Sequence, residues 1–254
     1  KIPASVYGIR STTWSIKPSN FSWVSGDSNS LQPEVKFNQP GVYSISLAAK
    51  SCTSNATETK SLWVRVFPAA FSATCNSKTR FQTSNFGIGV FDVKLTDNHF
   101  ESGTYFDDGE LLDMSAQKVF RVKPNTDYTV QVKVGLYNSE NVRVFMDFNN
   151  DGKFQAFKGE VSAQTSAKPG EYAQVKIKTP AKMQLNQALR MRVISDYNNI
   201  DTTGCGTCNY GQAEDFSLVF EKTTVAFGVD RARSAAGAAA TVAPPPHLHC
   251  AHRS

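Results

Sequence analysis

The stretch FMDFNNDGKF carries the residues whose types and spacing come closest to a chemical site. Oxygen-bearing side chains alternate along it and Gly152 follows them. A tight loop that binds a hard cation needs such alternating oxygens and a glycine, because the chain must bring several oxygens to one point. The predicted calcium ligands are Asp147, Asn149, Asp151, Lys153 through its carbonyl oxygen, and Glu160.

The loop departs from an EF-hand at its twelfth position. Lys158 stands where that motif has a bidentate Glu, and Glu160, two residues further on, is the nearest substitute. The flanking residues VRVF alternate as a strand does, so we expect the loop on a β-hairpin. Two interpretations stay open: a weak calcium site, with a dissociation constant on the order of 10⁻⁴ to 10⁻³ M as in extracellular modules, or an Asx turn held by hydrogen bonds within the loop.

A pair of adjacent acids, Glu214 and Asp215, has the residue types of a general acid and base. Neighbours on a strand point to opposite faces of a sheet, so these two side chains do not converge on one substrate atom. A carboxylate on a sheet face normally needs a cationic neighbour. We therefore favour an ion pair of one of the acids with Arg190 or Arg192 over completion of the calcium shell.

Five cysteines, Cys52, Cys75, Cys205, Cys208 and Cys250, leave one unpaired if the others form bridges. The CxxC at 205–208 resembles a metal knuckle or redox motif, but no second CxxC or correctly spaced His follows it in the folded part. We expect a bridge from Cys75 to Cys205 or Cys208, as in a protein of an oxidising compartment. It would close over a hundred residues, which the chain-entropy model values at about 4 to 5 kcal/mol.

Apolar and polar residues alternate with period two in most of the segments that must position these residues. In VYSISLA, Tyr43, Ile45 and Leu47 share one face, and later segments repeat the pattern up to Phe220, which predicts half-buried antiparallel strands. Only GELLDMSAQKVF, residues 109–120, has the pattern of a short helix. The predicted fold is all-β, with two β-sandwich domains.

The domain boundary is expected near RVFPAAFSATC, where a strand ends and Pro68 interrupts the pattern. The predicted domains are 1–68 and 69–222. Residues 223–254 lose strand periodicity and consist largely of Ala, Pro, Gly and basic residues, so we expect a disordered, low-complexity tail.

Composition excludes several classes of function. The formal net charge is only +5 and no basic stripe carries interleaved aromatics, which argues against nucleic-acid binding. No run approaches the roughly 18 consecutive apolar residues of a membrane span. The sequence begins at Lys1 without a leader, so we expect that any export signal has been removed or lies upstream.

Residues 12–66 resemble a PKD domain through the TWSIKP strand, the PEVKFNQPGVYSISLAA hairpin and the closing TKSLWVRV strand. The usual first strand of that family is not evident in KIPASVYGIR. The resemblance implies an Ig-like sandwich that acts as a spacer in secreted and surface proteins.

Residues 75–221 resemble a GEVED domain, a β-sandwich module named for its last strand. That motif stands here as YGQAEDFSLVFE, with Gln212 and Ala213 in place of its second and third letters. VFMDFNNDGKF, KGE, ALRMRV and a cysteine-bearing loop before the motif support the resemblance, in the same order as in the family.

Together the two resemblances imply an accessory region of a larger secreted or cell-surface bacterial protein. Such a pair often lies downstream of a catalytic domain, including metalloproteases similar to the pappalysins. No HExxH occurs, and His99 is the only histidine before residue 223, too few for a two-His zinc site. We therefore expect no catalytic activity in this chain itself.

The leading hypothesis is a non-catalytic adhesion or accessory region, stabilised by calcium, that docks or spaces a larger protein on an extracellular protein or glycan. One alternative is a carbohydrate-binding module, which needs an exposed aromatic row; another is a part of a secreted metalloprotease whose catalytic domain lies outside the chain. Trp14, Trp23 and Trp63 would form a sugar platform if exposed, but Ig-like sandwiches bury a Trp, so we predict that Trp14 belongs to the core.

Overall fold

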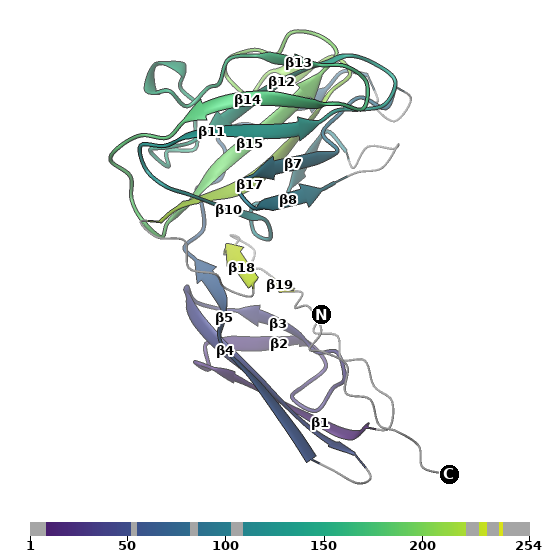
Figure 1. Cartoon of the computed structure of the whole chain (residues 1–254), viewed down its shortest axis with the longest axis vertical. Helices are drawn as coiled ribbons and strands as arrows, with labels where there is room; N and C mark the ends of the chain where they lie inside the picture. Colours follow the sequence, from purple (N-terminus) through teal and green to yellow (C-terminus); the bar gives the residue numbers. More distant parts are fainter. Residues whose placement is uncertain are drawn as a thin grey trace. The chain divides into compact units, whose positions relative to one another are not determined.

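The computed structural model describes residues 9–51, 55–81, 86–102, 109–221, 229–232 and 239–240. The chain divides into two compact units, unit 1 (residues 1–68 and 225–254) and unit 2 (residues 69–224), each considered by itself (Figure 1). Within the described residues the regular elements are strands, apart from one short 3₁₀ turn, η2 (Ala156–Lys158). The all-β prediction is therefore confirmed.

Unit 1 consists of two sheets. Their strands are β1 (Ile9–Lys17), β2 (Phe21–Ser25), β3 (Glu34–Phe37), β4 (Gly41–Ser51), β5 (Asn55–Phe67), β18 (Val229–Ala232) and β19 (Ala239–Ala240). The first sheet has the order β1-β4-β5-β18 and the second the order β19-β3-β2. All pairings are antiparallel except that of β18 with β5.

The core of unit 1 is built by the alternating residues of both sheets. Trp14 and Ile16 on β1 pack in one cluster with Val35 on β3 and with Tyr43 and Ile45 on β4. Trp14 is buried, which confirms its predicted place in the core, and its indole N–H donates to the backbone oxygen of Ser30 at 2.9 Å. Trp23 and Trp63 are partly buried against the same cluster, so the three tryptophans do not form an open platform.

Within the predicted tail, residues 223–254, the structure describes only β18 and β19. Both pair with strands of unit 1, β18 with β5 and β19 with β3. Cys52 and Cys250 lie outside the described residues, so the structure leaves their pairing open.

Unit 2 has twelve described strands. They are β6 (Lys78–Thr79), β7 (Asp92–Leu95), β8 (Asn98–Glu101), β9 (Leu111–Asp113), β10 (Val119–Val122), β11 (Asp127–Lys133), β12 (Glu140–Met146), β13 (Thr165–Ala167), β14 (Tyr172–Lys178), β15 (Ala188–Asp196), β16 (Thr207–Cys208) and β17 (Gln212–Phe220). One main sheet has the order β10-β17-β15-β12-β13, with β9 also on β17; the other has the order β14-β11-β7-β8; β16 and β6 form a short parallel pair.

The two main sheets of unit 2 enclose its principal core. Val130 and Val132 from β11 meet Met191 and Val193 from β15 in this cluster, together with Phe216 from β17. Each of the two sheets contributes one of its faces to this core, as a two-layer sandwich requires.

The central strands β15 and β17 are buried along their whole length, nine residues each. For β17 this differs from the predicted half-buried pattern. The second face of both strands carries a smaller apolar cluster that includes Phe145, Phe154 and Ile194. It also carries charged side chains, Arg190 and Arg192 among them. Strands covered on both faces lose the clean apolar–polar alternation.

The helix considered for residues 109–120 is wrong. The segment forms β9, a turn and β10, and both strands pair in parallel with consecutive stretches of β17. The turn is fixed by the N–H of Met114, which donates to the oxygen of Asp215 at 2.8 Å, and by the Ser217 hydroxyl, which donates to the oxygen of Ser115 at 2.7 Å. Tertiary pairing along β17 overrides a weak local helix preference.

Candidate functional site

The acidic loop begins where β12 ends, and Asp147 lies at its centre. The Asp147 carboxylate is buried and accepts the backbone N–H of Asp151 at 3.0 Å and that of Gly152 at 2.7 Å. The side-chain oxygen of Asn149 accepts the same Asp151 N–H at 3.2 Å, and Asp151 accepts the N–H of Lys153 at 2.9 Å. These are the backbone hydrogen bonds of nested Asx turns.

Glu160 closes the loop from the far side of η2. One of its carboxylate oxygens accepts the N–H groups of Phe148 and Asn149 at 3.1 and 3.3 Å, and the other accepts the N–H of Gln155 at 2.9 Å. Burial raises the pKa of Glu160, and the nearby Asp147 carboxylate raises it further. Burial likewise raises the pKa of Asp147, with a smaller contribution from Asp151. The loop thus concentrates negative charge that N–H dipoles offset only in part.

The predicted calcium ligands meet part of what an ion requires. Asp147 and Glu160 are buried and interact electrostatically, as two ligands of one ion would. Within the part of the chain that the structure describes, however, Asp92, His99 and Glu101 are the one group that brings three carboxylate, imidazole or thiolate atoms within 4.8 Å of one another. The carboxylates of the loop would have to move closer to share an ion, so calcium binding stays a prediction.

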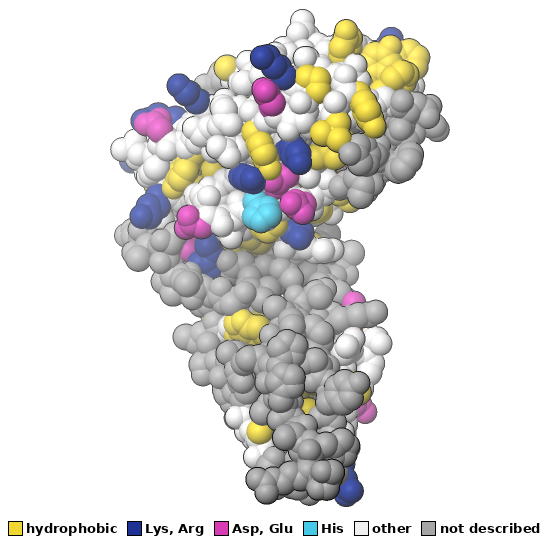
Figure 2. All heavy atoms as spheres, turned by 45° about the vertical axis from the view of Figure 1, so that its right-hand side comes forward, with side chains coloured by type: hydrophobic (Ala, Val, Ile, Leu, Met, Phe, Trp, Pro, Cys, Tyr) yellow, Lys and Arg dark blue, Asp and Glu magenta, His cyan; other side chains and the backbone are white. Residues whose placement is uncertain are grey.

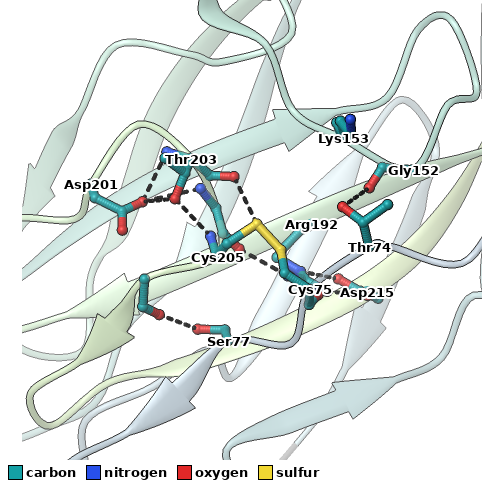
Figure 3. Close-up of a disulfide and its surroundings, with 12 residues drawn as sticks. Thr74, Cys75, Ser77, Gly152, Lys153, Arg192, Asp201, Thr203, Cys205 and Asp215 are labelled. Carbon is teal, nitrogen blue, oxygen red and sulfur yellow. Dashed lines mark hydrogen bonds and ion pairs between the residues drawn. A yellow bond between two sulfur atoms is a disulfide. The ribbon is translucent and has the colours of Figure 1, made fainter.

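Gly152 joins the loop to the segment that leads into unit 2, residues 69–77. Its φ of +80° lies in the left-handed region, and an added Cβ would lie 2.6 Å from the backbone oxygen of Ser72. The oxygen of Gly152 accepts the N–H of Thr74 at 2.8 Å and its hydroxyl at 3.1 Å (Figure 3). A side chain at this position would therefore separate the loop from the leading segment.

Asp215 on β17 is the centre of a buried ion-pair cluster. Its carboxylate takes two hydrogen bonds from the guanidinium of Arg192, at 2.7 and 2.9 Å, and one from Arg190 at 2.6 Å. Arg190 also contacts Asp113 on β9 at 3.1 Å. Burial lowers the pKa of Arg190, but Asp215 and Asp113 outweigh it and hold that pKa above its usual value.

The other guanidinium N–H groups of this cluster bind backbone oxygens of two connecting segments. Arg190 donates to Phe71 at 3.0 Å, and Arg192 donates to Cys75 at 3.2 Å and to Gly204 at 2.8 Å. Arg192 is fully buried. The cluster therefore fixes the leading segment and the turn at Gly204 on the sheet. Its role is to brace the fold. Glu214, also buried, neighbours Asp215 on β17 and so faces the opposite side of the sheet.

The disulfide joins Cys75 in the leading segment to Cys205 in the turn before β16 (Figure 3). This confirms the predicted bridge and selects Cys205 as its partner. Cys208 is a buried free thiol, 3.7 Å from the hydroxyl oxygen of Ser77, and burial raises its pKa to about 11. A thiol with so little thiolate at neutral pH is a structural residue and not a reactive one.

Four aromatic rings form a cluster at the ends of the strands near this disulfide, and we call them the aromatic surface: Phe81, Phe86, Tyr197 and Tyr210. The half-buried ring of Tyr210 lies at the centre, stacked on Phe81 with 5.0 Å between ring centroids. Phe86 and Tyr197 meet it edge-on at 5.0 and 6.3 Å. The three outer rings are exposed.

The aromatic surface was not predicted from the sequence. Its rings come from three separate connections: Phe81 and Phe86 lie between β6 and β7, Tyr197 between β15 and β16, and Tyr210 between β16 and β17. No spacing in the chain therefore brings all four together. The signal that could have identified it is the predicted proximity of the first and last segments of unit 2, which the Cys75–Cys205 bridge requires.

Comparison with known proteins gives one family match. Two solved structures are similar at low identity: a chimeric titin Z1Z2 functionalized with a KLER exogenous peptide from decorin (12% identity, 86% of this chain and 85% of that chain, TM-score 0.23), and a chimeric titin Z1Z2-Z1Z2 tandem functionalized with a GRGDS exogenous peptide from fibronectin (11%, 83% of each chain, TM-score 0.23). With TM-scores this low, neither likeness supports a statement about fold or function. No curated protein matches the chain.

None of the described residues forms a helix long and apolar enough to span a membrane. The PKD resemblance of unit 1 stays a prediction. The family model of the GEVED domain matches residues 141–219, which confirms the GEVED resemblance of unit 2 over that stretch.

Proposed function

We propose that the chain is a non-catalytic accessory region of a larger secreted or cell-surface bacterial protein, and that unit 2 docks this protein on an extracellular glycan. The GEVED match, the β-sandwich fold and the disulfide support an accessory module of an oxidising, extracellular compartment. Unit 1 serves in this proposal as a PKD-like spacer. Any hydrolase activity of the larger protein, including that of a metalloprotease, resides outside this chain.

The aromatic surface is the observation that carries the docking proposal. Exposed aromatic rings that touch one another offer apolar faces to a ligand, and soluble proteins seldom expose such clusters without a function. The apolar C–H faces of sugar rings pack against aromatic faces of this kind. The surface lies at strand ends, where β-sandwiches commonly place their binding loops.

Hydrogen bonds hold the aromatic surface in place before any ligand arrives. The Asp196 carboxylate accepts the N–H of Asn209 at 2.8 Å and that of Tyr210 at 3.1 Å. The N–H of Phe81 donates to the oxygen of Asn209 at 2.9 Å. Binding by a surface that is already ordered costs little conformational entropy.

Amide side chains surround the rings and suit a neutral, hydroxyl-rich ligand. Asn138 donates to the backbone oxygen of Phe86 at 3.2 Å, and Asn141 donates to that of Tyr197 at 3.3 Å. Sugar-binding sites combine an apolar platform with groups that donate and accept hydrogen bonds. This composition favours a glycan over a strongly charged partner.

Affinity electrophoresis in gels that contain single polysaccharides tests the proposal. We expect at least one polysaccharide to retard the protein, and expect Phe81→Ala and Tyr197→Ala to weaken the retardation about two- to tenfold, as the loss of one aromatic contact predicts. Phe157→Ala is the matched control, because Phe157 is an exposed aromatic on η2, outside the aromatic surface. Free mobility in every gel, or equal retardation of all four proteins, would contradict the proposal.

Calcium enters the proposal as a stabilising ion of the acidic loop. Burial raises the pKa of Asp147 and of Glu160, and a neighbouring carboxylate adds to each shift: Asp151 acts on Asp147, and Asp147 acts on Glu160. A cation among these carboxylates would relieve their repulsion. The oxygen ligands fit calcium, a hard cation.

A further inference from the structure

The hairpin of β7 and β8 gathers polar residues on one face. Asp92 pairs with Glu101, and Lys94 pairs with His99. Val93 and Leu95 alternate with them and pack into the principal core of unit 2. The four polar residues therefore share the face of the sheet that points away from that core.

Three of these side chains can supply ligand atoms to one ion. One ligand atom each from Asp92, His99 and Glu101 lies within 4.8 Å of the others. Zinc bonds His nitrogen and carboxylate oxygen at roughly 2.0–2.2 Å in a tetrahedral arrangement, which sets its ligand atoms about 3.3–3.6 Å apart. His99 and Glu101 are exposed, so their side chains have room to rotate toward one ion; Figure 2 shows the histidine beside acidic and basic side chains on the surface.

Asp92 gives an independent indication of a ligand. Its side chain is only 3% exposed, and its Oδ2 accepts a hydrogen bond from the hydroxyl of Tyr172 at 2.6 Å. Its Oδ1 is buried and has no hydrogen-bond partner among the described residues. Buried carboxylate oxygens are rarely left in this state, because water no longer solvates them.

An imidazole lies close to Asp92 Oδ1, the oxygen that has no hydrogen-bond partner among the described residues. Nδ1 of His99 lies 3.5 Å from Asp92 Oδ1, which makes an ion pair only when the imidazole is protonated. The neutral imidazole instead offers a lone pair, as a metal ligand does. A cation between the two groups would satisfy both.

We propose that Asp92, His99 and Glu101 form a surface site for a divalent transition metal of the zinc class. Tyr172 is the outer partner that orients Asp92 through Oδ2, as groups behind metal ligands commonly do. The site uses one His and two carboxylates, so it differs from the two-His protease site that the sequence excludes.

Two lysines near the site oppose the binding of a cation. The ammonium of Lys94 lies 3.6 Å from Asp92 Oδ2 and 4.2 Å from the centroid of the Tyr172 ring. Lys133 pairs with Asp92 across β11 and β7. Removal of the nearer charge should strengthen metal binding, which an ordinary surface ion pair would not predict.

Zinc titration by calorimetry on the full chain tests the proposal. His247, His249, Cys250 and His252 are residue types that ligate zinc, so the same titration is run on a variant in which all four are replaced by alanine. That variant should still bind one zinc ion. Addition of His99→Ala or Glu101→Gln should weaken its binding about a hundredfold or more, beyond the 10- to 100-fold loss typical of an outer-shell change.

Asp97→Asn is the matched control, because Asp97 is an exposed acid in the turn of the same hairpin. It should leave the affinity unchanged, whereas Lys94→Met should raise it. Circular dichroism shows whether each variant is folded. Absence of binding in the four-residue variant, or equal binding with His99→Ala and Glu101→Gln, would overturn the proposal.

Discussion

At the scale of single residues, the most consequential contact is the sharing of one carboxylate by two buried arginines. Asp215 contacts both Arg190 and Arg192, and its side chain is only 1% exposed. Removal of one partner from a buried ion pair leaves the other charge uncompensated. The stability of unit 2 therefore depends strongly on this one residue.

We expect Asp215→Asn to lower the free energy of unfolding of unit 2 by about 3–5 kcal/mol. Asp113→Asn is the matched control: Asp113 also contacts Arg190, but its side chain is 52% exposed, and exposed pairs contribute about 0–1 kcal/mol. Denaturant unfolding followed by circular dichroism measures both. All three tryptophans lie in unit 1, so the tryptophan fluorescence transition should not move; equal losses in the two variants would contradict the bracing role.

Sequence reasoning reached part of this residue-scale arrangement. It placed Arg190, Arg192, Glu214 and Asp215 together because a carboxylate on a sheet face needs a cation. It could not choose Asp215 over Glu214, because the choice depends on which face of β17 the leading segment covers. The aromatic surface was missed for the same reason: it depends on the tertiary structure, and no local sequence pattern encodes it.

At the scale of elements, the acidic loop connects β12 to η2 and makes a prediction for calcium. With a dissociation constant of about 1 mM, calcium at about 10 mM should stabilise unit 2 by about 1.4 kcal/mol through mass action. That corresponds to a rise of about 3–5 °C in its melting temperature. Thermal melts followed by circular dichroism, in calcium and in chelator, measure the shift.

Asp151→Asn should reduce the calcium effect, because it removes one charge from the proposed ligand set while Asp147 and Glu160 remain. Magnesium should act more weakly, since it requires a near-ideal octahedral shell and releases its waters reluctantly. Identical melting temperatures in calcium and in chelator would contradict calcium binding, and only the Asx-turn interpretation of the loop would remain.

The strands themselves were the most predictable elements, because alternation of apolar and polar residues reports one buried face. The pattern failed where other forces decide the structure. Residues 109–120 form strands that pair with the edge of β17, although their local sequence favours a helix. The half-buried pattern expected of β17 also failed, because the sequence does not reveal that the leading segment covers the second face of this strand.

At the scale of the whole molecule, the disulfide ties the beginning of unit 2 to its end. Cys75 and Cys205 are 130 residues apart in sequence. We expect their bridge to contribute about 4–5 kcal/mol by restricting the unfolded chain. Denaturant unfolding of unit 2, with and without reductant, measures this contribution.

Cys75→Ala combined with Cys205→Ala provides the control for the reductant. In that variant the reductant should have no further effect, because the buried Cys208 thiol has no bridge to lose. An unchanged midpoint on reduction of the wild-type protein would contradict the expected contribution.

The same bond also determines how unit 2 would respond to tension along the chain. A docking module of a surface protein is loaded along its chain, and the covalent link between Cys75 and Cys205 carries that load past the residues between them. The enclosed 130 residues correspond to roughly 430–470 Å of contour length. As long as the bond is oxidised, this length cannot be released, so the strands from β6 to β15 are shielded from mechanical load, whereas β16 and β17, which follow Cys205, remain in its path.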